Sequence, residues 1–434
     1  MAEYKHSVAL DTDKCKACTH CLKRCPTEAI RVRSGHAIIN SERCIDCGQC
    51  IRYCPHNAKQ AVFDSLDSFR DYRYKIALPP PSLCGQFENL DDVDVLLQGL
   101  LDWGFDDVFE VARAAELVTE YTRRYLRQPN VKRPVISSAC PVITRLIQLR
   151  FPFLLDNIID LLPPIEIAAS QAKLQAKAKH PELTDEDICV VFISPCPAKV
   201  SYVKNQASGE PSAIDFVVSM SDMYFALLDV LKHETVPVPV SRTGMIGLSW
   251  ASTGGESSAL LNDRYLAADG IENVIRVLDE MEVGSYPYLD FVELNACDGG
   301  CVGGVMAVEN PYIARVRLQS IRRYLPVSQY RPDNRDSDDI PEKFLMPQRP
   351  QHDPALRIHP DRRRAMELMA QTKKVFSELP ELDCGFCGAP SCRAFAEDVV
   401  RGTVSADACV LVLKAKYEKG DSDDGGTASG GDGS

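Results

Sequence analysis

Cysteine in the central part of this chain is concentrated in short loops that follow apolar, strand-like runs. Residues 137–141, 194–199 and 293–301 contain four such cysteines: Cys140, Cys196, Cys297 and Cys301. A tight zinc ribbon takes its ligands in close pairs, and a disulfide joins only two thiols. Four cysteines delivered from three distant loops therefore indicate one buried metal cluster rather than a disulfide or a zinc site.

A second group of cysteines forms an internal repeat near the N-terminus. The spacing Cys-x2-Cys-x2-Cys-x3-Cys-Pro occurs twice, 29 residues apart, and residues 30–32 and 37–39 between the runs read as a hairpin. The run resembles that of bacterial ferredoxins, whose fourth cysteine ligates the other cluster. This resemblance implies two electron-conducting 4Fe-4S clusters, with structural zinc as the alternative. Their ligand sets are Cys15, Cys18, Cys21 and Cys54, and Cys44, Cys47, Cys50 and Cys25.

A third group lies near the C-terminus and has the spacing Cys-x2-Cys-x4-Cys-x16-Cys. Its members are Cys384, Cys387, Cys392 and Cys409. The spacing resembles that of a small 4Fe-4S domain found in corrinoid and electron-transport proteins, and glycines near the cysteines let backbone amides approach the sulfurs. A third accessory 4Fe-4S cluster is expected here, with zinc as the alternative.

The composition places most of the chain among compact globular proteins. With 434 residues, about three units are expected. The net charge of -12 argues against nucleic-acid binding, and no apolar run resembles a signal peptide or a membrane span. Sixteen of the 18 cysteines fall into ligand-spaced groups, which favours reduced thiolates in the cytoplasm over secretion. The other two, Cys84 and Cys189, are expected to be structural, although the loop around Cys84 could approach a cluster.

Residues 74–325 alternate apolar strand-like runs with amphipathic helices, which predicts an α/β fold. Strands are expected at 108–111, 135–136, 190–193, 216–218 and 291–294, and helices at segments such as 92–101, 142–159 and 361–379. The three central cysteine segments then follow strands directly, at the carboxyl ends where α/β sheets bind their ligands. The predicted domains are residues 1–75, 76–330 and 361–418, with a linker or surface wrap at 331–360 and a disordered tail at 419–434.

Together these motifs make residues 1 to about 325 resemble an iron-only (FeFe) hydrogenase. The family resemblance implies an α/β H-cluster domain with two lobes around a buried cluster, flanked by a small α+β bacterial-ferredoxin domain and a small C-terminal iron-sulfur domain. By this resemblance, Cys140, Cys196 and Cys297 hold a 4Fe-4S cubane, and Cys301 bridges it to a two-iron unit with CO and CN ligands. Lys199 matches the family's lysine that is hydrogen-bonded to a cyanide ligand; an exposed lysine is the alternative. The implied reaction is the reversible conversion of H2 into two protons and two electrons.

The chain also departs from the family pattern. Ala139 stands where the family has a cysteine that relays protons, and a methyl group cannot transfer a proton. Ser194 and Asn295 replace methionines and are expected to change hydrogen bonding near the two-iron unit. The segment 112–120 resembles a family stretch that is followed by a Glu pair, which is absent here. This pattern resembles the sensory iron-only hydrogenases and implies slow turnover.

The expected partners are H2 and protons, a ferredoxin-like electron donor or acceptor or a signalling partner, and maturation proteins. No nucleic acid or membrane is expected, and a homodimer is compatible with the sequence. Two other functions remain open. One is a hydrogenase-like iron-sulfur assembly factor that binds only a cubane, and the other is an electron-transfer subunit of a larger redox complex.

Overall fold

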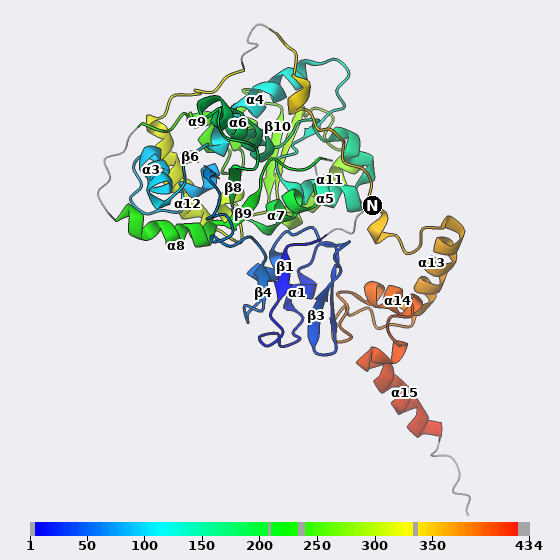
Figure 1. Ribbon diagram of the computed structural model, residues 1–434. Coiled ribbons are helices and arrows are strands. Elements are labelled where there is room, and N and C mark those ends of the chain that lie inside the picture. Colours follow the sequence, from blue (N-terminus) through cyan, green and yellow to red (C-terminus); the bar gives the residue numbers. More distant parts are fainter. Residues whose placement is uncertain (1–4, 207–209, 233–238, 333–336, 424–434) are drawn as a thin grey trace, which may run out of the picture. The chain divides into compact units, whose positions relative to one another are not determined.

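The computed structural model describes residues 5–206, 210–232, 239–332 and 337–423 (Figure 1). The chain divides into two compact units, and each is described by itself. The first consists of Met1–Ala9, Ile45–Gly48 and Gln60–Asp353. The second consists of Leu10–Cys44, Gln49–Lys59 and Pro354–Ser434.

A four-stranded parallel sheet forms the centre of the first unit. Its order is β6-β5-β8-β9, with the bounds β5 Tyr74–Leu78, β6 Asp107–Val108, β8 Ile188–Ser194 and β9 Phe216–Ser219. Every residue of β8 is buried, because a central parallel strand is covered on both faces. Val190 and Phe192 enter one apolar cluster, whereas Val191 and Ile193 enter another on the opposite face. The alternation follows the two-residue period of a strand.

A second parallel sheet of three strands lies in the same unit. Its order is β10-β11-β7, with the bounds β7 Val135–Ile136, β10 Tyr265–Asp269 and β11 Phe291–Asn295. Phe291 and Val292 of β11 are in register with Val135 and Ile136 of β7. The two sheets correspond to the two lobes that the family resemblance implies.

Helices cover both sheets (Figure 1). One face of the larger sheet contacts α6, which packs on α4, while α8 contacts β8 and packs on α3. Helices α10 and α11 contact the smaller sheet. The bounds are α3 Val93–Trp103, α4 Val111–Arg127, α5 Pro141–Arg150, α6 Pro164–Lys179, α7 Pro197–Lys204, α8 Met220–Leu231, α9 Met245–Ser249, α10 Gly255–Ala259, α11 Ile271–Glu282 and α12 Pro311–Ile321.

Two expected elements differ from those in the structure. The helix expected over 142–159 ends at Arg150, and a 3-10 helix, Pro152–Asn157, follows it. Proline removes a backbone donor and clashes with the preceding turn, which explains the break. The strand expected over 108–111 stops at Val108, because α4 begins at Val111. The helix expected from residue 92 is present, with the Asp92 side chain capping its first turn.

The two N-terminal cysteine runs repeat their backbone conformation along with their spacing; Ile45–Gly48 of the second run belong to the first unit, and the rest of both runs belongs to the second. Ala17 and Asp46, and likewise Glu28 and Asn57, take left-handed conformations at equivalent positions of the two runs. The predicted hairpin is present as β2 and β3. The bounds are β1 Val8–Leu10, α1 His20–Lys23, β2 Ile30–Arg33, β3 His36–Ile39, α2 Gln49–Arg52 and β4 Lys59–Ala61, with β1 paired to β4.

The C-terminal part of the second unit is helical, with α13 Arg362–Ser377, α14 Cys392–Val400 and α15 Val410–Asp423. Helix α13 matches the helix expected over 361–379. Helix α15 continues five residues into the segment expected to be disordered from 419, since backbone bonds propagate a helix through residues that do not break it. The rest of that predicted tail, residues 424–434, lies outside the described residues.

The segment expected as a linker or surface wrap contributes to the core of the first unit. Phe344, in the 3-10 helix Glu342–Phe344, is buried, and its carbonyl oxygen accepts the N–H of Leu162 at 2.9 Å. Its ring lies 5.0 Å from that of Tyr121. This part of the segment is therefore a strap that is packed on the unit, and residues 333–336 lie outside the described part of the chain.

Candidate functional site

The three central cysteine segments each leave the carboxyl end of a strand. Cys140 follows β7 and occupies the N-cap position of α5, Cys196 follows β8 and occupies the N-cap position of α7, and Cys297 follows β11. Proline occupies the first position of both helices, where a backbone N–H is not needed. Because the unpaired N–H groups of a helix start carry partial positive charge, α5 and α7 place favourable dipoles beside two thiolates.

Lys199 lies among all four central cysteines. Its Nζ is 3.6 Å from the Sγ of Cys301, and the residue is 8% exposed. Burial lowers the pKa of Lys199, but attraction to Cys301, Cys196, Cys140 and Cys297 outweighs burial and leaves this pKa above its ordinary value. The buried ammonium group therefore contacts the sulfur of Cys301 and interacts electrostatically with the other three central cysteines.

The same environment acts on the thiols. Burial raises the pKa of Cys140 and of Cys196, while the ammonium of Lys199 opposes that shift. Isolated thiolates are disfavoured in such a place, whereas metal-bound thiolates share their charge with the metal. The donor set thus fits an iron-sulfur group with a nearby anionic part that an ammonium can neutralise.

Glycines let the last cysteine loop pack tightly against its neighbours. A Cβ on Gly304 would lie 2.2 Å from the carbonyl oxygen of Pro195, and one on Gly303 would lie 2.0 Å from that of Asp298. Gly300 has a φ of +89°, and a Cβ there would lie 2.7 Å from the backbone nitrogen of Thr253. The loop therefore brings Cys301 onto the segment that carries Cys196.

The three positions expected to depart from the family pattern, Ala139, Ser194 and Asn295, take part in local hydrogen bonds. The Ser194 hydroxyl donates to the carbonyl oxygen of Cys196 at 2.8 Å, so it fixes the cysteine loop. Asn295 donates from Nδ2 to Glu293 at 3.0 Å. The backbone N–H of Ala139 donates to Ser137 Oγ at 3.2 Å.

Two buried acids, Glu256 and Glu293, are hydrogen-bonded to Ser137 and Asn295, next to these positions. The sequence alone did not indicate them. The Ser137 Oγ donor lies 2.8 and 2.7 Å from the two carboxylate oxygens of Glu256. Burial raises the pKa of Glu256 well above its ordinary value, and the neighbouring charge of Glu293 raises it further. Burial also raises the pKa of Glu293. Two interacting buried carboxyl groups favour holding a proton at neutral pH.

Glu293 is held from several sides. Its carboxylate accepts the N–H of Gly254 and both the N–H and the hydroxyl of Ser257, at 2.8–2.9 Å. It also accepts from Asn295. A glutamate inside the apolar strand 291–294 is the sequence signal that could have revealed it, because a buried strand rarely carries an unpaired charge.

The segment 112–120 has a structural task in this fold. The Glu116 carboxylate accepts the N–H of Gly244, of Gln329 and of Tyr330 and the hydroxyl of Ser328, at 2.5–2.9 Å. With all these donors satisfied, Glu116 joins α4 to two distant backbone segments. It is therefore engaged as a structural anchor.

The N-terminal ligand set of Cys15, Cys18, Cys21 and Cys54 shows the same kind of gathering. Burial raises the pKa of Cys21 to about 11; Lys59 opposes this shift, and Cys18, Cys54 and Cys15 add to it. The fourth cysteines of the two runs also match. Their sulfurs accept backbone N–H groups four residues later, Cys25 from Ala29 at 3.2 Å and Cys54 from Ala58 at 3.3 Å. Such N–H donors tune the potential of a cluster.

The C-terminal cysteines are also neighbours. Burial raises the pKa of Cys387, and the charges of Cys409, Cys384 and Cys392 raise it further. Within the described ranges, no group of three or more His, Cys, Asp or Glu side chains is gathered tightly enough for a single metal ion.

Cys84 and Cys189 lie outside these groups. Both are buried in the apolar cluster on one face of the larger sheet. Burial raises the pKa of each to about 12, and nearby Glu110 adds to the shift of Cys84.

In the part of the chain that the structure describes, no helix has the length and apolar character needed to span a bilayer.

Family models match three regions of the chain. The model of the iron-only hydrogenase large subunit, C-terminal domain, matches residues 75–262 and 254–305, which is more than half of the 434 residues. A 4Fe-4S dicluster domain matches residues 7–55, and an Fe-S cluster family matches residues 379–411. These regions contain the central, N-terminal and C-terminal cysteine groups, respectively.

Two curated relatives are similar to different parts of the chain. The periplasmic Fe hydrogenase large subunit of Nitratidesulfovibrio vulgaris is 26% identical over 365 residues, covering 69% of this chain and 86% of that protein. The corrinoid/iron-sulfur protein large subunit of Moorella thermoacetica is 40% identical over 45 residues, covering 10% of each protein. A solved FeFe-hydrogenase of Chlamydomonas reinhardtii aligns with a TM-score of 0.48 at 17% identity, covering 63% of this chain and 90% of that one. By the match of its central domain, this chain belongs to the iron-only hydrogenase large-subunit family.

Proposed function

We propose that this chain is a slow iron-only hydrogenase that interconverts H2 with two protons and two electrons and serves as an H2 sensor. The observation that carries the proposal is the convergence of Cys140, Cys196, Cys297 and Cys301 on the buried ammonium of Lys199. When bound there, an H-cluster supplies the iron centre at which H2 is split or formed. Family membership supports this assignment.

The proposed roles of the five residues are those that the family resemblance implies. Cys140, Cys196 and Cys297 would hold the cubane, and Cys301 would be the ligand between it and the two-iron unit. Lys199 donates hydrogen bonds to an anionic cyanide ligand, since a buried ammonium needs a charged acceptor. Its contact with Cys301 at 3.6 Å places the ammonium beside the bridging thiolate. Ser194 and Asn295 act indirectly, by fixing the Cys196 loop and Glu293.

The low expected rate follows from Ala139. A relay residue must bind and release a proton, and losing general acid-base transfer costs about 10²- to 10⁴-fold. The methyl group of Ala139 cannot do this. A slow enzyme consumes little of the gas that it detects, which suits a sensor better than a bulk producer or consumer of H2.

An alternative proton store lies beside that position. Ser137 is two residues before Ala139, and its hydroxyl contacts Glu256, whose neighbour is Glu293. We infer that this acid pair holds one proton at neutral pH and exchanges it through Ser137. A hydroxyl can accept one proton and donate another, so the path needs no cysteine at Ala139.

Electrons are proposed to pass through three accessory 4Fe-4S clusters held by the N-terminal and C-terminal cysteine groups. Their partner is a ferredoxin-like carrier or a signalling protein that receives electrons or a conformational change. Maturation proteins are proposed to supply the two-iron unit, because its CO and CN ligands do not assemble from iron and sulfide alone.

Infrared spectroscopy of the fully matured chain tests the proposal. CO and CN stretching bands that change under H2, together with slow H2 uptake, are expected. Iron at the central site without these bands would favour the cubane-only assembly factor. Bands without H2 reactivity in the isolated chain, with activity only after copurified subunits are restored, would favour the electron-transfer subunit of a larger complex.

A further inference from the structure

The loop that carries the C-terminal cysteines is bonded to the part of the dicluster domain that carries Cys21 and Cys25. The N–H of Val32 donates to the carbonyl oxygen of Gly388 at 2.9 Å. The Arg33 guanidinium donates to the carbonyl oxygen of Cys387 at 2.9 Å, and Lys23 donates to that of Pro390 at 2.8 Å. All of these residues belong to the second unit. The contacts therefore join the backbone of the C-terminal cysteine loop to the backbone and side chains near Cys21 and Cys25 of the dicluster domain.

A nearly buried ion cluster reinforces this contact. Asp398 of α14 accepts from Arg31 Nε at 2.7 Å and from Arg31 Nη2 at 3.2 Å, so that pair is bidentate. Arg33 Nη2 donates to the same carboxylate at 2.6 Å. The Asp398 side chain is only 11% exposed. Charge-assisted bidentate bonds have defined geometry as well as strength, so they fix orientation.

The backbones approach too closely at this contact for a side chain to intervene. Gly388 has a φ of +74°, and a Cβ built on it would lie 2.0 Å from the carbonyl oxygen of Val32. A Cβ on Gly385 would lie 3.1 Å from the side chain of Lys23. The glycines between the cysteines therefore shape the loop for its neighbour as well as for a cluster.

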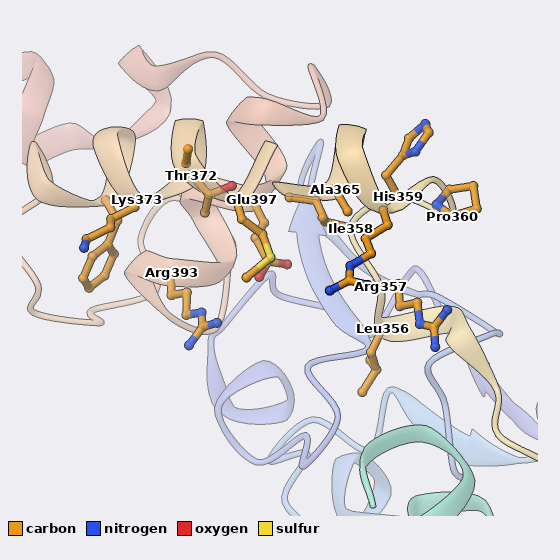
Figure 2. A pocket seen from close by; sticks show the side chains of 14 residues that line it. Leu356, Arg357, Ile358, His359, Pro360, Ala365, Thr372, Lys373, Arg393 and Glu397 are labelled. Carbon is orange, nitrogen blue, oxygen red and sulfur yellow. The ribbon is translucent and has the colours of Figure 1, made fainter. Parts of the chain in front are cut away.

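On its other side, α14 packs against α13 of the same C-terminal domain. Figure 2 shows Arg393 and Glu397 of α14 lining a cavity together with Ala365, Thr372 and Lys373 of α13. The two helices pack on one another. Asp398, the next residue after Glu397, instead bonds the hairpin arginines. Helix α14 thus joins α13 to the dicluster hairpin.

We propose that Asp398 is a positioning residue that, with Arg31 and Arg33, holds the cluster of Cys384, Cys387, Cys392 and Cys409 beside the dicluster domain. This proposal rests on the accessory clusters of the proposed function but not on its H2 chemistry. In this position, one electron can pass between the third cluster and a dicluster neighbour. The donor cluster is oxidised by one electron and the acceptor is reduced by one, with no bond or proton changed.

Electron paramagnetic resonance of the full chain tests the placement. The chain is loaded with iron and sulfide, its iron is counted, and dithionite supplies the electrons. A Cys409→Ala chain, which lacks the third cluster, gives the signals of the dicluster domain and of the central cubane without the third signal. In the unmodified chain we expect the third signal to be broadened or split by magnetic interaction with a dicluster neighbour.

The Asp398→Asn variant is expected to lose that interaction while keeping its iron, and Asp398→Glu is expected to recover part of it. Glu367→Gln is the matched control, because it also removes one carboxylate from the C-terminal domain, and Glu367 pairs with the half-exposed Arg364 of its own helix. An interaction of unchanged strength in Asp398→Asn would overturn the proposal. So would its absence in the fully loaded, unmodified chain.

A variant in the dicluster domain controls for the case in which Asp398→Asn disturbs the folding of the C-terminal domain. If Asp398→Asn fails to hold the third cluster, the double variant Arg31→Gln/Arg33→Gln leaves the C-terminal domain unaltered and is expected to remove the interaction. Retention of the interaction in the double variant would contradict the positioning role. Infrared bands at the central site report on the proposed function separately, so failure of one proposal does not imply failure of the other.

Discussion

The Nζ of Lys199 lies 3.6 Å from the Sγ of Cys301, and the charges of all four central cysteines act on the same ammonium. A lysine in this place costs desolvation free energy unless it meets negative charge. Among the side chains other than cysteine, Lys199 is therefore the one expected to matter most for retaining an anionic cluster.

Replacing Lys199 with Met is expected to weaken retention of the two-iron unit. A hydrogen bond to a charged group contributes about 1.5–3 kcal/mol, which is roughly a 10- to 100-fold change in retention. The readout is the intensity of the CO and CN bands per iron bound at the central site. Lys204→Met is the control, since Lys204 lies on the same helix but pairs with Asp64 at the surface. Equal bands in Lys199→Met and the control would argue against the anchor.

Glu256→Gln is expected to lower H2 turnover by about 10²- to 10⁴-fold, because an amide cannot take part in general acid-base transfer. The variant keeps a side-chain oxygen for the Ser137 hydroxyl, so the infrared bands are expected to remain. Glu120→Gln, a partly exposed position on α4, provides the control. Unchanged turnover in Glu256→Gln would mean that protons reach the site by another route.

Ala139→Cys is expected to raise turnover by up to about 10²-fold by restoring a group that can exchange protons at this position. Ala139→Val adds bulk without an ionisable group and is the comparison. The measurement is H2 evolution per mole of H-cluster, with the bands used to count clusters. A variant with intact bands and no gain in rate would show that the thiol is not the missing step.

Stability is expected to depend on pH through Glu256. Burial and Glu293 raise the pKa of Glu256 in the folded chain, so the folded state keeps a proton that the unfolded state loses above about pH 4.3. Where the folded state binds more protons, stability falls as pH rises. Glu256→Gln stays neutral, so its Tm relative to the unmodified chain is expected to increase between pH 5 and pH 8. A difference in Tm that does not vary with pH would contradict this assignment.

Much of the fold was predictable because its signals are local. The all-apolar run of β8 and the cysteine spacings can be read from short windows of sequence, and the parallel strands bring the cysteine segments to carboxyl ends as expected. The division into two sheets was implied only by family resemblance. The break after Arg150 depends on how Pro152 competes with an otherwise helical pattern.

The acid pair escaped prediction for a different reason. Glu256 follows two glycines in a loop-like segment, and Glu293 lies 37 positions later in a strand. Neither local pattern shows that the two carboxyl groups meet. Their raised pKa values depend on burial and on each other, and both conditions arise only when α10 packs against β11.

Cys84 provides a last test of which cysteines hold clusters. It is buried among apolar side chains, and its pKa of about 12 leaves it as a thiol at neutral pH. Cys84→Ala is therefore expected to keep all of its iron and its infrared bands, while losing about 1 kcal/mol of stability from impaired packing. In the native chain, Cys84 is expected to resist iodoacetamide until unfolding, because alkylation requires an accessible thiolate. Iron analysis and mass spectrometry of labelled peptides measure both outcomes, and loss of iron from Cys84→Ala would instead make Cys84 part of a cluster site.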